Sequence, residues 1–277
     1  MSTDLPPDRI AFIGGGNMAT AIVGGLQRQG LAGRIQVVEP LAEQRERLQA
    51  LGVEVLAAAD ARLAGTALAV WAVKPQTFQQ AAAEAGPHLA GALHLSVAAG
   101  IRSDTLAGWL GSERIVRAMP NTPALIGQGI TGLYARPSVS EAERRQMEAV
   151  VHTTGESLWL NEEALLDAVT ALSGSGPAYV FYFIEAMAQA GQAMGLDAEA
   201  ALRLAKATFT GASALARESS EPPEVLRQRV TSKGGTTYAA LSAMEQAGLK
   251  PHFIAAIRAA QARAAELGDE FGRPAGA

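Results

Sequence analysis

The first 160 residues alternate between short apolar runs and segments whose apolar residues recur at helical spacing. Residues 66–73 are nearly all apolar, as expected of a strand that is buried on both faces of a parallel sheet. Leu41, Leu48 and Leu51 instead share one face of a helix. The predicted strands span residues 10–13, 34–39, 53–55, 66–73, 93–97, 114–119, 129–135 and 155–160. This alternation predicts an α/β fold with a doubly wound, mainly parallel sheet.

The pattern changes at Glu162, after which strand signals disappear and alanine-rich helical periodicity takes over. The predicted helices span residues 163–172, 179–194, 198–219, 236–247 and 252–267. We therefore predict one domain over residues 8–161 and an all-α domain over residues 162–277. Small residues such as Ala186 and Ala190 permit close helix approach but bury little area. A second copy would bury these helices better, so we predict a homodimer through the helical domain.

Three glycines follow the first predicted strand, where a helix begins. Gly14 permits a tight turn, Gly16 leaves room for a pyrophosphate beside the backbone, and small Ala19 lets helix and strand pack closely. The N–H groups of the helix N-terminus would face the phosphates. The Gly-x-Gly-x-x-Ala pattern is weak alone, but here it has the required context on both sides. We predict a dinucleotide site, the alternative being an ordinary glycine-rich turn.

Glu39 ends the second predicted strand, where a dinucleotide fold meets the adenosine ribose. A carboxylate there accepts a hydrogen bond from the ribose 2′-OH and favours NAD over NADP. The alternative is a solvated acid at a strand end, since Arg45 and Arg47 follow closely and could meet a 2′-phosphate. The sequence leaves both interpretations open.

The ends of two further strands supply other candidate cofactor contacts. Pro75 can begin the helix after the strand over residues 66–73, while Lys74 stays at the carboxyl edge of the sheet. Lys74 is either a cofactor contact or a solvated charge. The small residues 98–100 end another strand and leave room for a flat ring.

Two breaks interrupt the helical pattern of the second half. Residues 173–179, Ser-Gly-Ser-Gly-Pro-Ala-Tyr, predict a flexible loop with Pro177 in the first turn of the next helix. Residues 230–238 carry two glycines and several hydroxyls before another helix. Each segment presents N–H and hydroxyl groups at a helix start, so each could bind a carboxylate. The alternative is a pair of capped interhelical turns.

Composition excludes several kinds of chemistry. The chain of 277 residues has a formal net charge of −4 and no cysteine, which excludes disulfides, thiolate nucleophiles and Cys-ligated zinc. Its four histidines lack metal-ligand spacing, so we expect no metal site. Acidic and basic residues are interspersed, so the sequence shows no basic cluster of the kind that binds nucleic acid or an anionic membrane. Residues 1–8 do not resemble a signal peptide, and Pro, Gly, Asn and Ser break the uncharged stretches 118–135 and 168–184. We expect a cytoplasmic protein without membrane spans.

Six motifs spread over nearly the whole chain occur together in one family. They are GGGNMA at 14–19, AVKPQ at 72–76, VAAGI at 97–101, MPNTPA at 119–124, LSGSGPAY at 172–179 and VTSKGGTT at 230–237. The first is shared with many dehydrogenases, and the last three are specific. Together they resemble the pyrroline-5-carboxylate reductases. The resemblance implies a Rossmann-like domain, a helical dimerisation domain, and reduction of 1-pyrroline-5-carboxylate to L-proline by NADPH or NADH, the last step of proline biosynthesis. It also implies a homodimer, which in this family sometimes assembles into a ring of dimers.

The resemblance assigns roles to individual residues. The implied cofactor contacts, along the glycine turn and three strand ends, are Ile13, Gly14, Gly15, Gly16, Asn17, Met18, Ala19, Glu39, Ala72, Val73, Lys74, Pro75, Ala98, Ala99 and Gly100. The implied substrate contacts are Asn121, Ser175, Gly176, Ser232, Gly235, Thr236 and Thr237. Thr237 is the implied catalytic residue, with its hydroxyl bonded to the ring nitrogen of the substrate.

Three departures from the family pattern matter. Lys233 stands where the family commonly has proline, which could change the rigidity of its loop or add positive charge near a carboxylate. Ala59 and Asp60 stand where many members have asparagine, so one hydrogen bond to the cofactor could be missing. Glu39 stands where NADP-preferring members carry small polar or basic residues, so a preference for NADPH is not inherited.

The implied substrate is a cyclic imine that bears a carboxylate, and its protonated iminium is already an electrophile. Positioning rather than a strong acid or a covalent nucleophile should therefore carry the catalysis. Residues 234–237 would anchor the carboxylate through N–H groups and hydroxyls. The second half of the chain has no catalytic triad or carboxylate pair, which agrees with this mechanism.

Two kinds of alternative remain. The first is another reductase of the same two-domain architecture, such as a β-hydroxyacid dehydrogenase or a different imine reductase. The hydroxyacid type needs a lysine general acid on the first long helix of the second domain, and residues 179–194 contain none. A non-catalytic NAD(P)-binding regulator is the other, although it would not need both loops rich in Ser, Gly and Thr.

Overall fold

A computed structural model describes residues 9–272 of the chain, so the expectation about residues 1–8 lies outside the described part. The chain divides into two compact units by its contacts. The first comprises residues 9–175 and 260–272, and the second is Gly176–Ala259. These units are defined by contacts alone, and the functional division after residue 161 stays a prediction.

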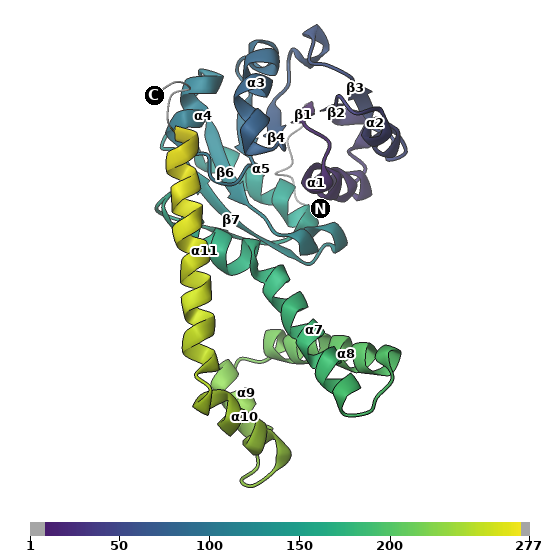
Figure 1. Cartoon of the computed structure of the whole chain (residues 1–277). Coiled ribbons are helices and arrows are strands. Elements are labelled where there is room, and N and C mark those ends of the chain that lie inside the picture. Colours follow the sequence, from purple (N-terminus) through teal and green to yellow (C-terminus); the bar gives the residue numbers. More distant parts are fainter. Residues whose placement is uncertain (1–8, 273–277) are drawn as a thin grey trace. The chain divides into compact units, whose positions relative to one another are not determined.

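Within residues 9–272, eight strands form one sheet in the order β3-β2-β1-β4-β5-β6-β7-β8 (Figure 1). The strands are β1 (Ile10–Ile13), β2 (Ile35–Val38), β3 (Glu54–Leu56), β4 (Leu68–Trp71), β5 (Leu93–Ser96), β6 (Ile115–Met119), β7 (Gly129–Ala135) and β8 (Gly155–Trp159). Neighbouring strands are parallel except for β6 and β7, which are antiparallel. The strand order reverses between β1 and β4, which is where open α/β sheets bind their ligands.

Helices cover both faces of this sheet, and each face has its own hydrophobic core. They are α1 (Asn17–Arg28), α2 (Ala42–Gln49), α3 (Pro75–Ala85), α4 (Ser103–Leu110), α5 (Glu141–Val151) and α6 (Leu165–Val169). Ile10 and Phe12 of β1 point into the core with α1 and α5, whereas Ala11 and Ile13 point into the core with α3 and α4. The residues of β1 are thus apolar on both faces of the sheet.

Short helical turns connect several of these elements. The 3₁₀ turns are η1 (Ala32–Arg34), η2 (Ala61–Leu63), η3 (Gly86–His88), η4 (Thr122–Ile126) and η5 (His152–Thr154), and η6 (Thr170–Gly174) is a π-helical turn. The π-helical turn continues α6 without a break.

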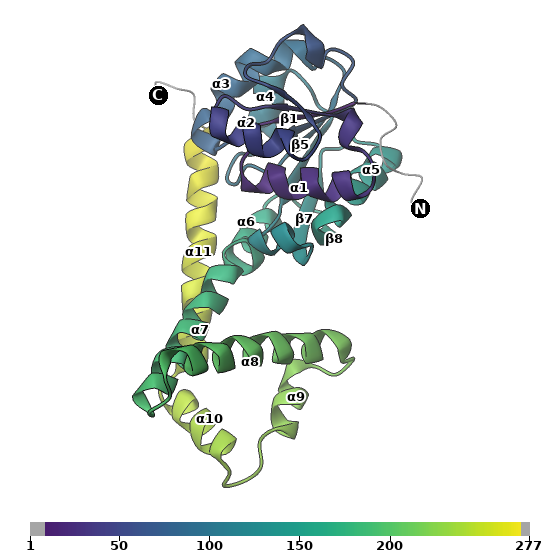
Figure 2. The ribbon, with the colours of Figure 1, turned by 90° about the vertical axis from the view of Figure 1, so that its right-hand side faces the viewer.

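The second unit is entirely helical (Figure 2). Its helices are α7 (Gly176–Ala193), α8 (Ala198–Glu218), α9 (Pro223–Arg229), α10 (Thr236–Gln246) and the first part of α11 (Leu249–Gly272), whose last 13 residues, 260–272, belong to the first unit. In the second unit, Phe253 packs edge-on against Tyr179 and Phe183. Of the helices formed by residues 9–272, none is long and apolar enough to cross a membrane.

The predicted flexible loop at residues 173–179 is wrong. Residues 173 and 174 belong to the π-helical turn, α7 begins at Gly176, and the Ser175 N–H donates to the Thr170 carbonyl oxygen at 2.8 Å. Pro177 lies in the first turn of α7, where its missing N–H costs no helical hydrogen bond. Glycine and serine have low helix propensity and favour a loop, but the surrounding packing overrides these weak preferences.

His94, on β5, is buried in the sheet beside Trp71 of the neighbouring strand β4. Its Nδ1 accepts a hydrogen bond from Trp71 Nε1 at 3.1 Å, and only 3% of the residue is exposed. Burial, with a smaller contribution from the positive charge of Arg114, lowers the pKa of His94 to about 4 from its ordinary 6.5. The native state therefore holds this imidazole neutral.

This burial makes the free energy of unfolding depend on pH. Between about pH 6.5 and pH 4 the unfolded chain binds a proton that the native chain rejects, so stability falls as the pH falls through that window. The loss is about 3 kcal/mol once the pH lies below 4. Urea unfolding at several pH values measures this slope.

His94→Asn is the variant that isolates the effect, because an amide oxygen can accept from Trp71 but does not titrate. We expect the variant to be less stable than the wild type near neutral pH and to show a shallower slope between pH 4 and 6.5. An identical slope in both proteins would show that other groups cause the acid sensitivity.

Candidate functional site

The glycine turn lies between β1 and α1, at the point where the strand order reverses. Gly14 has a φ of +94°, and a Cβ there would lie 2.7 Å from the Ala72 carbonyl oxygen. A Cβ on Gly15 would lie 2.5 Å from Leu48 Cδ1, whereas one on Gly16 would meet no protein atom within 4 Å. Gly14 and Gly15 are therefore required by the fold, while Gly16 borders open space.

The first turn of α1 faces that open space with its backbone donors. Gly16 is the N-cap of α1, and the N–H groups of Asn17, Met18 and Ala19 have no acceptor within the helix. Ala19 is fully buried against the sheet, as the predicted close packing of helix and strand requires. These features fit the pyrophosphate of a dinucleotide, because an anion gains from both the free donors and the helix dipole.

Glu39 is buried beside this turn and is not the solvated acid that the sequence left open. Its Oε2 accepts from the Gly15 N–H and its Oε1 from the Leu41 N–H, both at 2.8 Å, and the residue is 6% exposed. Arg45 Nη1 donates to the Glu39 carbonyl oxygen at 3.2 Å, and Arg47 pairs with a glutamate on its own helix. The carboxylate therefore connects the glycine turn to the loop that follows β2.

The carboxyl end of β4 lies next to that of β1, and the carboxyl end of β5 lies next to that of β4. Lys74 is exposed at the N-cap of α3, and Pro75 is in the first turn of that helix. Ala98 is buried, and Ala99 and Gly100 are half-buried. The predicted cofactor residues thus gather along one edge of the sheet, and their individual contacts stay predictions.

Asp60, one of the departures from the family pattern, caps the turn η2. It accepts from the backbone N–H and the side chain of Arg62. The hydrogen bonds from Arg62 lower the pKa of Asp60 to about 2. This carboxylate is consequently engaged with Arg62 near the end of β3.

Among the predicted substrate residues, Asn121 and Ser175 lie in the first unit. Asn121 Oδ1 accepts from the Ile130 N–H at 3.0 Å, so this side chain fixes the turn between β6 and β7. Met119, at the end of β6, lies against Gly174, where a Cβ would be 2.5 Å from its Cε. The end of β6 and the π-helical turn therefore pack together.

The remaining predicted substrate residues, Gly176, Ser232, Gly235, Thr236 and Thr237, lie in the second unit. Gly234 has a φ of +74°, and a Cβ on Gly235 would lie 2.6 Å from Ser232 Oγ. Gly235 is the N-cap of the 11-residue helix α10, whose first residues are Thr236 and Thr237. The turn thus presents two hydroxyls and free N–H groups, which suit a carboxylate.

Sequence reasoning missed one part of the site region. The last turns of α11 pack on the loop after β5, because a Cβ on Gly100 would lie 3.1 Å from Leu267 Cβ and 3.3 Å from Phe271 Cδ2. Phe271 also packs against the core that contains α3 and α4. No local signal marks this contact, since it joins residues that are far apart in the chain.

The strand order, the glycine turn and the buried acid after β2 are the marks of a Rossmann fold. Two family profiles match parts of the chain. Residues 9–100 match the family described as NADP oxidoreductase, coenzyme F420-dependent, and residues 163–267 match the one described as pyrroline-5-carboxylate reductase dimerisation. The fold and site thus define a nicotinamide-dependent oxidoreductase with a helical second half.

The similarity to known proteins extends over nearly the whole chain. A pyrroline-5-carboxylate reductase of Pseudomonas aeruginosa is 43% identical over 269 residues, which cover 96% of this chain and 98% of the relative. This chain belongs to the pyrroline-5-carboxylate reductase family. The predicted family and fold class are confirmed, and the alternative reductases and the regulator are not favoured.

Solved structures agree with this assignment. The structure of a pyrroline-5-carboxylate reductase from Coxiella burnetii has a TM-score of 0.88 and 37% identity, covering 95% of this chain and 99% of that one. The Plasmodium falciparum pyrroline carboxylate reductase, solved with NADP bound, has a TM-score of 0.83 and 26% identity, with the same coverage of both chains.

Proposed function

We propose that this chain reduces 1-pyrroline-5-carboxylate to L-proline with NADPH or NADH, as the last step of proline biosynthesis. The observation that carries the proposal is the 43% identity to a pyrroline-5-carboxylate reductase over 96% of the chain. The assay follows the loss of reduced-nicotinamide absorbance on addition of the cyclic imine and detects proline as the product. Absence of turnover with both cofactors would contradict the proposal.

When bound, the reduced nicotinamide supplies the hydride for the imine carbon. The residues proposed to hold the dinucleotide are those of the glycine turn and of the ends of β2, β4 and β5. The first-turn N–H groups of α1 bind the pyrophosphate, and the small residues Ala98, Ala99 and Gly100 admit the flat nicotinamide ring. Lys74, exposed at the same edge, is proposed to contact the cofactor.

The substrate is proposed to bind through its carboxylate to the turn that precedes α10. The N–H groups and hydroxyls of this turn neutralise the carboxylate, and the Thr237 hydroxyl bonds the ring nitrogen. Asn121, Ser175, Gly176 and Ser232 complete the proposed substrate contacts. No side chain needs to form a covalent intermediate, because the protonated imine is electrophilic.

Replacing Glu39 by serine is expected to shift the preference from NADH toward NADPH. The carboxylate can accept from a ribose 2′-OH but repels a 2′-phosphate, so its removal should raise the NADPH-to-NADH ratio of kcat/KM about tenfold, or about 1.4 kcal/mol. Glu39→Arg should shift the ratio in the same direction. Initial rates with both cofactors measure it.

The structure adds a second consequence for this variant. Loss of the acceptors for the Gly15 and Leu41 N–H groups should also lower the melting temperature. Glu43→Gln, which removes an exposed acid on α2, is the matched control and should leave the ratio unchanged. An unchanged ratio in Glu39→Ser would exclude Glu39 from cofactor selection.

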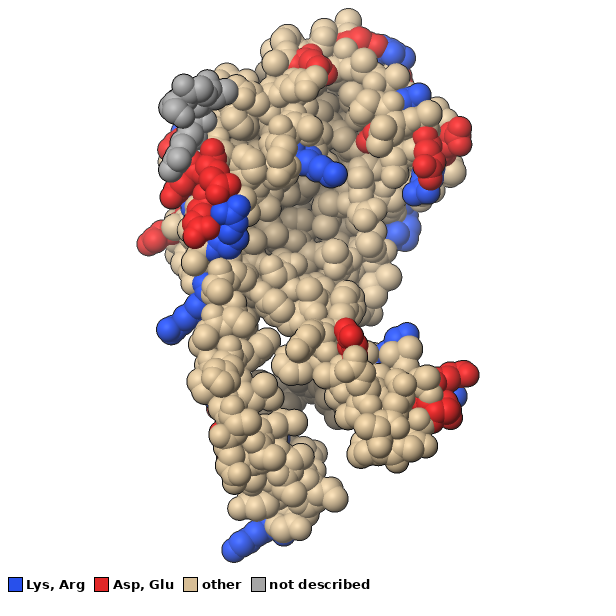
Figure 3. All heavy atoms as spheres, viewed as in Figure 1, with Lys and Arg blue, Asp and Glu red and all other residues tan. Residues whose placement is uncertain are grey.

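The helical unit is proposed to form a homodimer. Phe181, Tyr182 and Met194 are 64%, 70% and 78% exposed. A groove between α7 and α8 is lined by apolar residues such as Ile184 and Leu202 together with polar and charged ones such as Glu185 and Lys206. In Figure 3 the visible face of α7 and α8 carries its acidic and basic side chains mainly toward one end, and much of the rest is uncharged. Sedimentation would show a dimer, or a ring of dimers if dimers assemble further. The cytoplasmic location also stays a prediction, which cell fractionation tests.

A further inference from the structure

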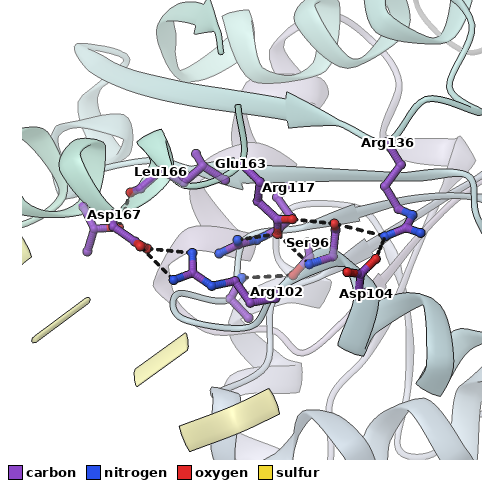
Figure 4. Close-up of polar contacts among 11 residues, drawn as sticks. Ser96, Arg102, Asp104, Arg117, Arg136, Glu163, Leu166 and Asp167 are labelled. Carbon is purple, nitrogen blue, oxygen red and sulfur yellow. Dashed lines mark hydrogen bonds and ion pairs between the residues drawn. The ribbon is translucent and has the colours of Figure 1, made fainter. Parts of the chain in front are cut away.

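A partly buried ion pair joins the start of α4 to α6 within the first unit (Figure 4). Arg102 Nη1 donates to Asp167 Oδ1 at 3.0 Å, and its Nη2 donates to Asp167 Oδ2 at 2.8 Å. Asp167 is buried and Arg102 is half-buried. This bidentate geometry restrains both the distance and the orientation of the two groups, which a single contact does not.

A second carboxylate strengthens the same connection. Glu163 Oε1 accepts from the Ser103 N–H at 2.6 Å, and its Oε2 accepts from Ser103 Oγ at 2.7 Å. Arg117 of β6, which is 5% exposed, donates to Glu163 Oε1 at 2.7 Å. The two residues at the start of α4 are therefore tied to the segment around α6 by four hydrogen bonds from Arg102 and Ser103.

The two connected segments carry different parts of the candidate site. Arg102 follows directly after the loop of residues 98–101, proposed to face the nicotinamide. Asp167 lies on α6, which continues into the π-helical turn that ends beside Ser175. Turns of π-helix occur frequently at functional sites, and here the turn is fixed at its base by Asp167.

The C-terminal helix α11 packs against the guanidinium of Arg102 at Gly268. A Cβ on Gly268 of α11 would lie 2.6 Å from Arg102 Nε and 2.7 Å from its Nη2. Only glycine leaves room for the guanidinium at this point of the helix. Arg102 thus lies against the backbone of α11 while it bonds to α6, so its position is restrained from two directions.

We propose that Arg102 and Asp167 are positioning residues for hydride transfer. They hold the loop of residues 98–101 at a fixed position relative to the π-helical turn that leads to Ser175. The proposal rests on the proposed function, because it assumes that this loop contacts the nicotinamide. Neither residue contacts the reacting atoms. The Arg117–Glu163 pair, whose arginine is buried more deeply than Arg102, supports the fold around them.

Asp167→Asn and Arg102→Gln test the proposal, since each removes one charge. Asn keeps the size of the aspartate side chain, and Gln keeps a polar but shorter one. We expect kcat per NADPH-binding site to fall about tenfold, with less than a threefold change in the KM for either substrate. The deuterium isotope effect on kcat, measured with NADPH deuterated at the transferred position, should equal or exceed that of the wild type. Arg102→Lys should recover only part of the loss, because a single ammonium cannot replace the bidentate contact.

Amide hydrogen exchange supplies a readout that does not depend on turnover. In Asp167→Asn, exchange of residues 98–103 should accelerate at least tenfold, while β2 keeps its wild-type rates. Arg263→Gln, which removes an exposed ion-pair cluster on α11, is the control and should change neither kcat nor this exchange.

Three results would overturn the positioning role. They are an unchanged kcat per site in Asp167→Asn, a fall in kcat with a smaller isotope effect, and unaltered exchange of residues 98–103. A wild-type chain that binds NADPH but does not reduce the imine would instead contradict the proposed function, and the positioning role with it.

Discussion

Replacing Gly16 by alanine is expected to weaken NADPH binding at least tenfold while leaving the melting temperature within about 1 °C of the wild type. A Cβ at this position meets no protein atom within 4 Å, and the φ of −67° suits any residue, so the fold should accept the change. The same methyl group enters the space above the first turn of α1, where the pyrophosphate is proposed to bind. A tenfold loss is about 1.4 kcal/mol. Fluorescence titration with NADPH and thermal unfolding measure the two quantities.

Gly14→Ala is the contrasting variant. Its Cβ would lie 2.7 Å from the Ala72 carbonyl oxygen at a φ of +94°, so this change should lower both NADPH affinity and the melting temperature. The pair separates a glycine needed by the ligand from one needed by the fold. If Gly16→Ala binds NADPH as tightly as the wild type does, the dinucleotide does not approach α1 as proposed.

Replacing Thr237 by alanine is expected to lower kcat by about one to two powers of ten and to leave NADPH binding intact. The proposed role of the hydroxyl is a hydrogen bond to the ring nitrogen, and losing a bond to a charged group costs about 1.5 to 3 kcal/mol. Thr237 is the second residue of α10, where its hydroxyl is not needed as an N-cap. Steady-state kinetics with the cyclic imine and NADPH titration together test this expectation.

Three further variants make the Thr237 result specific. Thr237→Ser keeps the hydroxyl and should retain most of the activity, whereas Thr237→Val keeps the shape and should behave like the alanine variant. Thr231→Ala removes a nearby hydroxyl that donates to the Arg227 carbonyl oxygen, and its turnover should stay within twofold of the wild type. Turnover of Thr237→Ala equal to that of the wild type would show that another group bonds the ring nitrogen.

The strands and the glycine turn could be predicted because their signals are local. The two-sided apolar pattern of β1 and β4 follows from burial on both faces, and the turn after β1 needs glycine at specific positions. The predicted strands over residues 10–13 and 129–135 have the bounds of β1 and β7.

The parts that sequence reasoning missed depend on contacts between distant residues. The hydrogen bond from the Gly15 N–H to Glu39 joins residues 24 positions apart, and the Arg102–Asp167 pair joins residues 65 positions apart. The π-helical turn that continues α6 contradicted the local loop signals of Ser173 and Gly174, because Met119 packs against this segment. Local preferences amount to tenths of a kcal/mol per residue and yield to such packing.

The two outermost strands of the sheet also bear on how copies of this chain meet. β3 has three residues and β8 has five, and each carries an exposed glutamate, Glu54 or Glu156. Short edge strands that carry negative charge resist pairing with a strand of another molecule. Copies of the chain, including partly unfolded ones, are therefore hindered from pairing strands between molecules. Specific association must then use the helical surfaces.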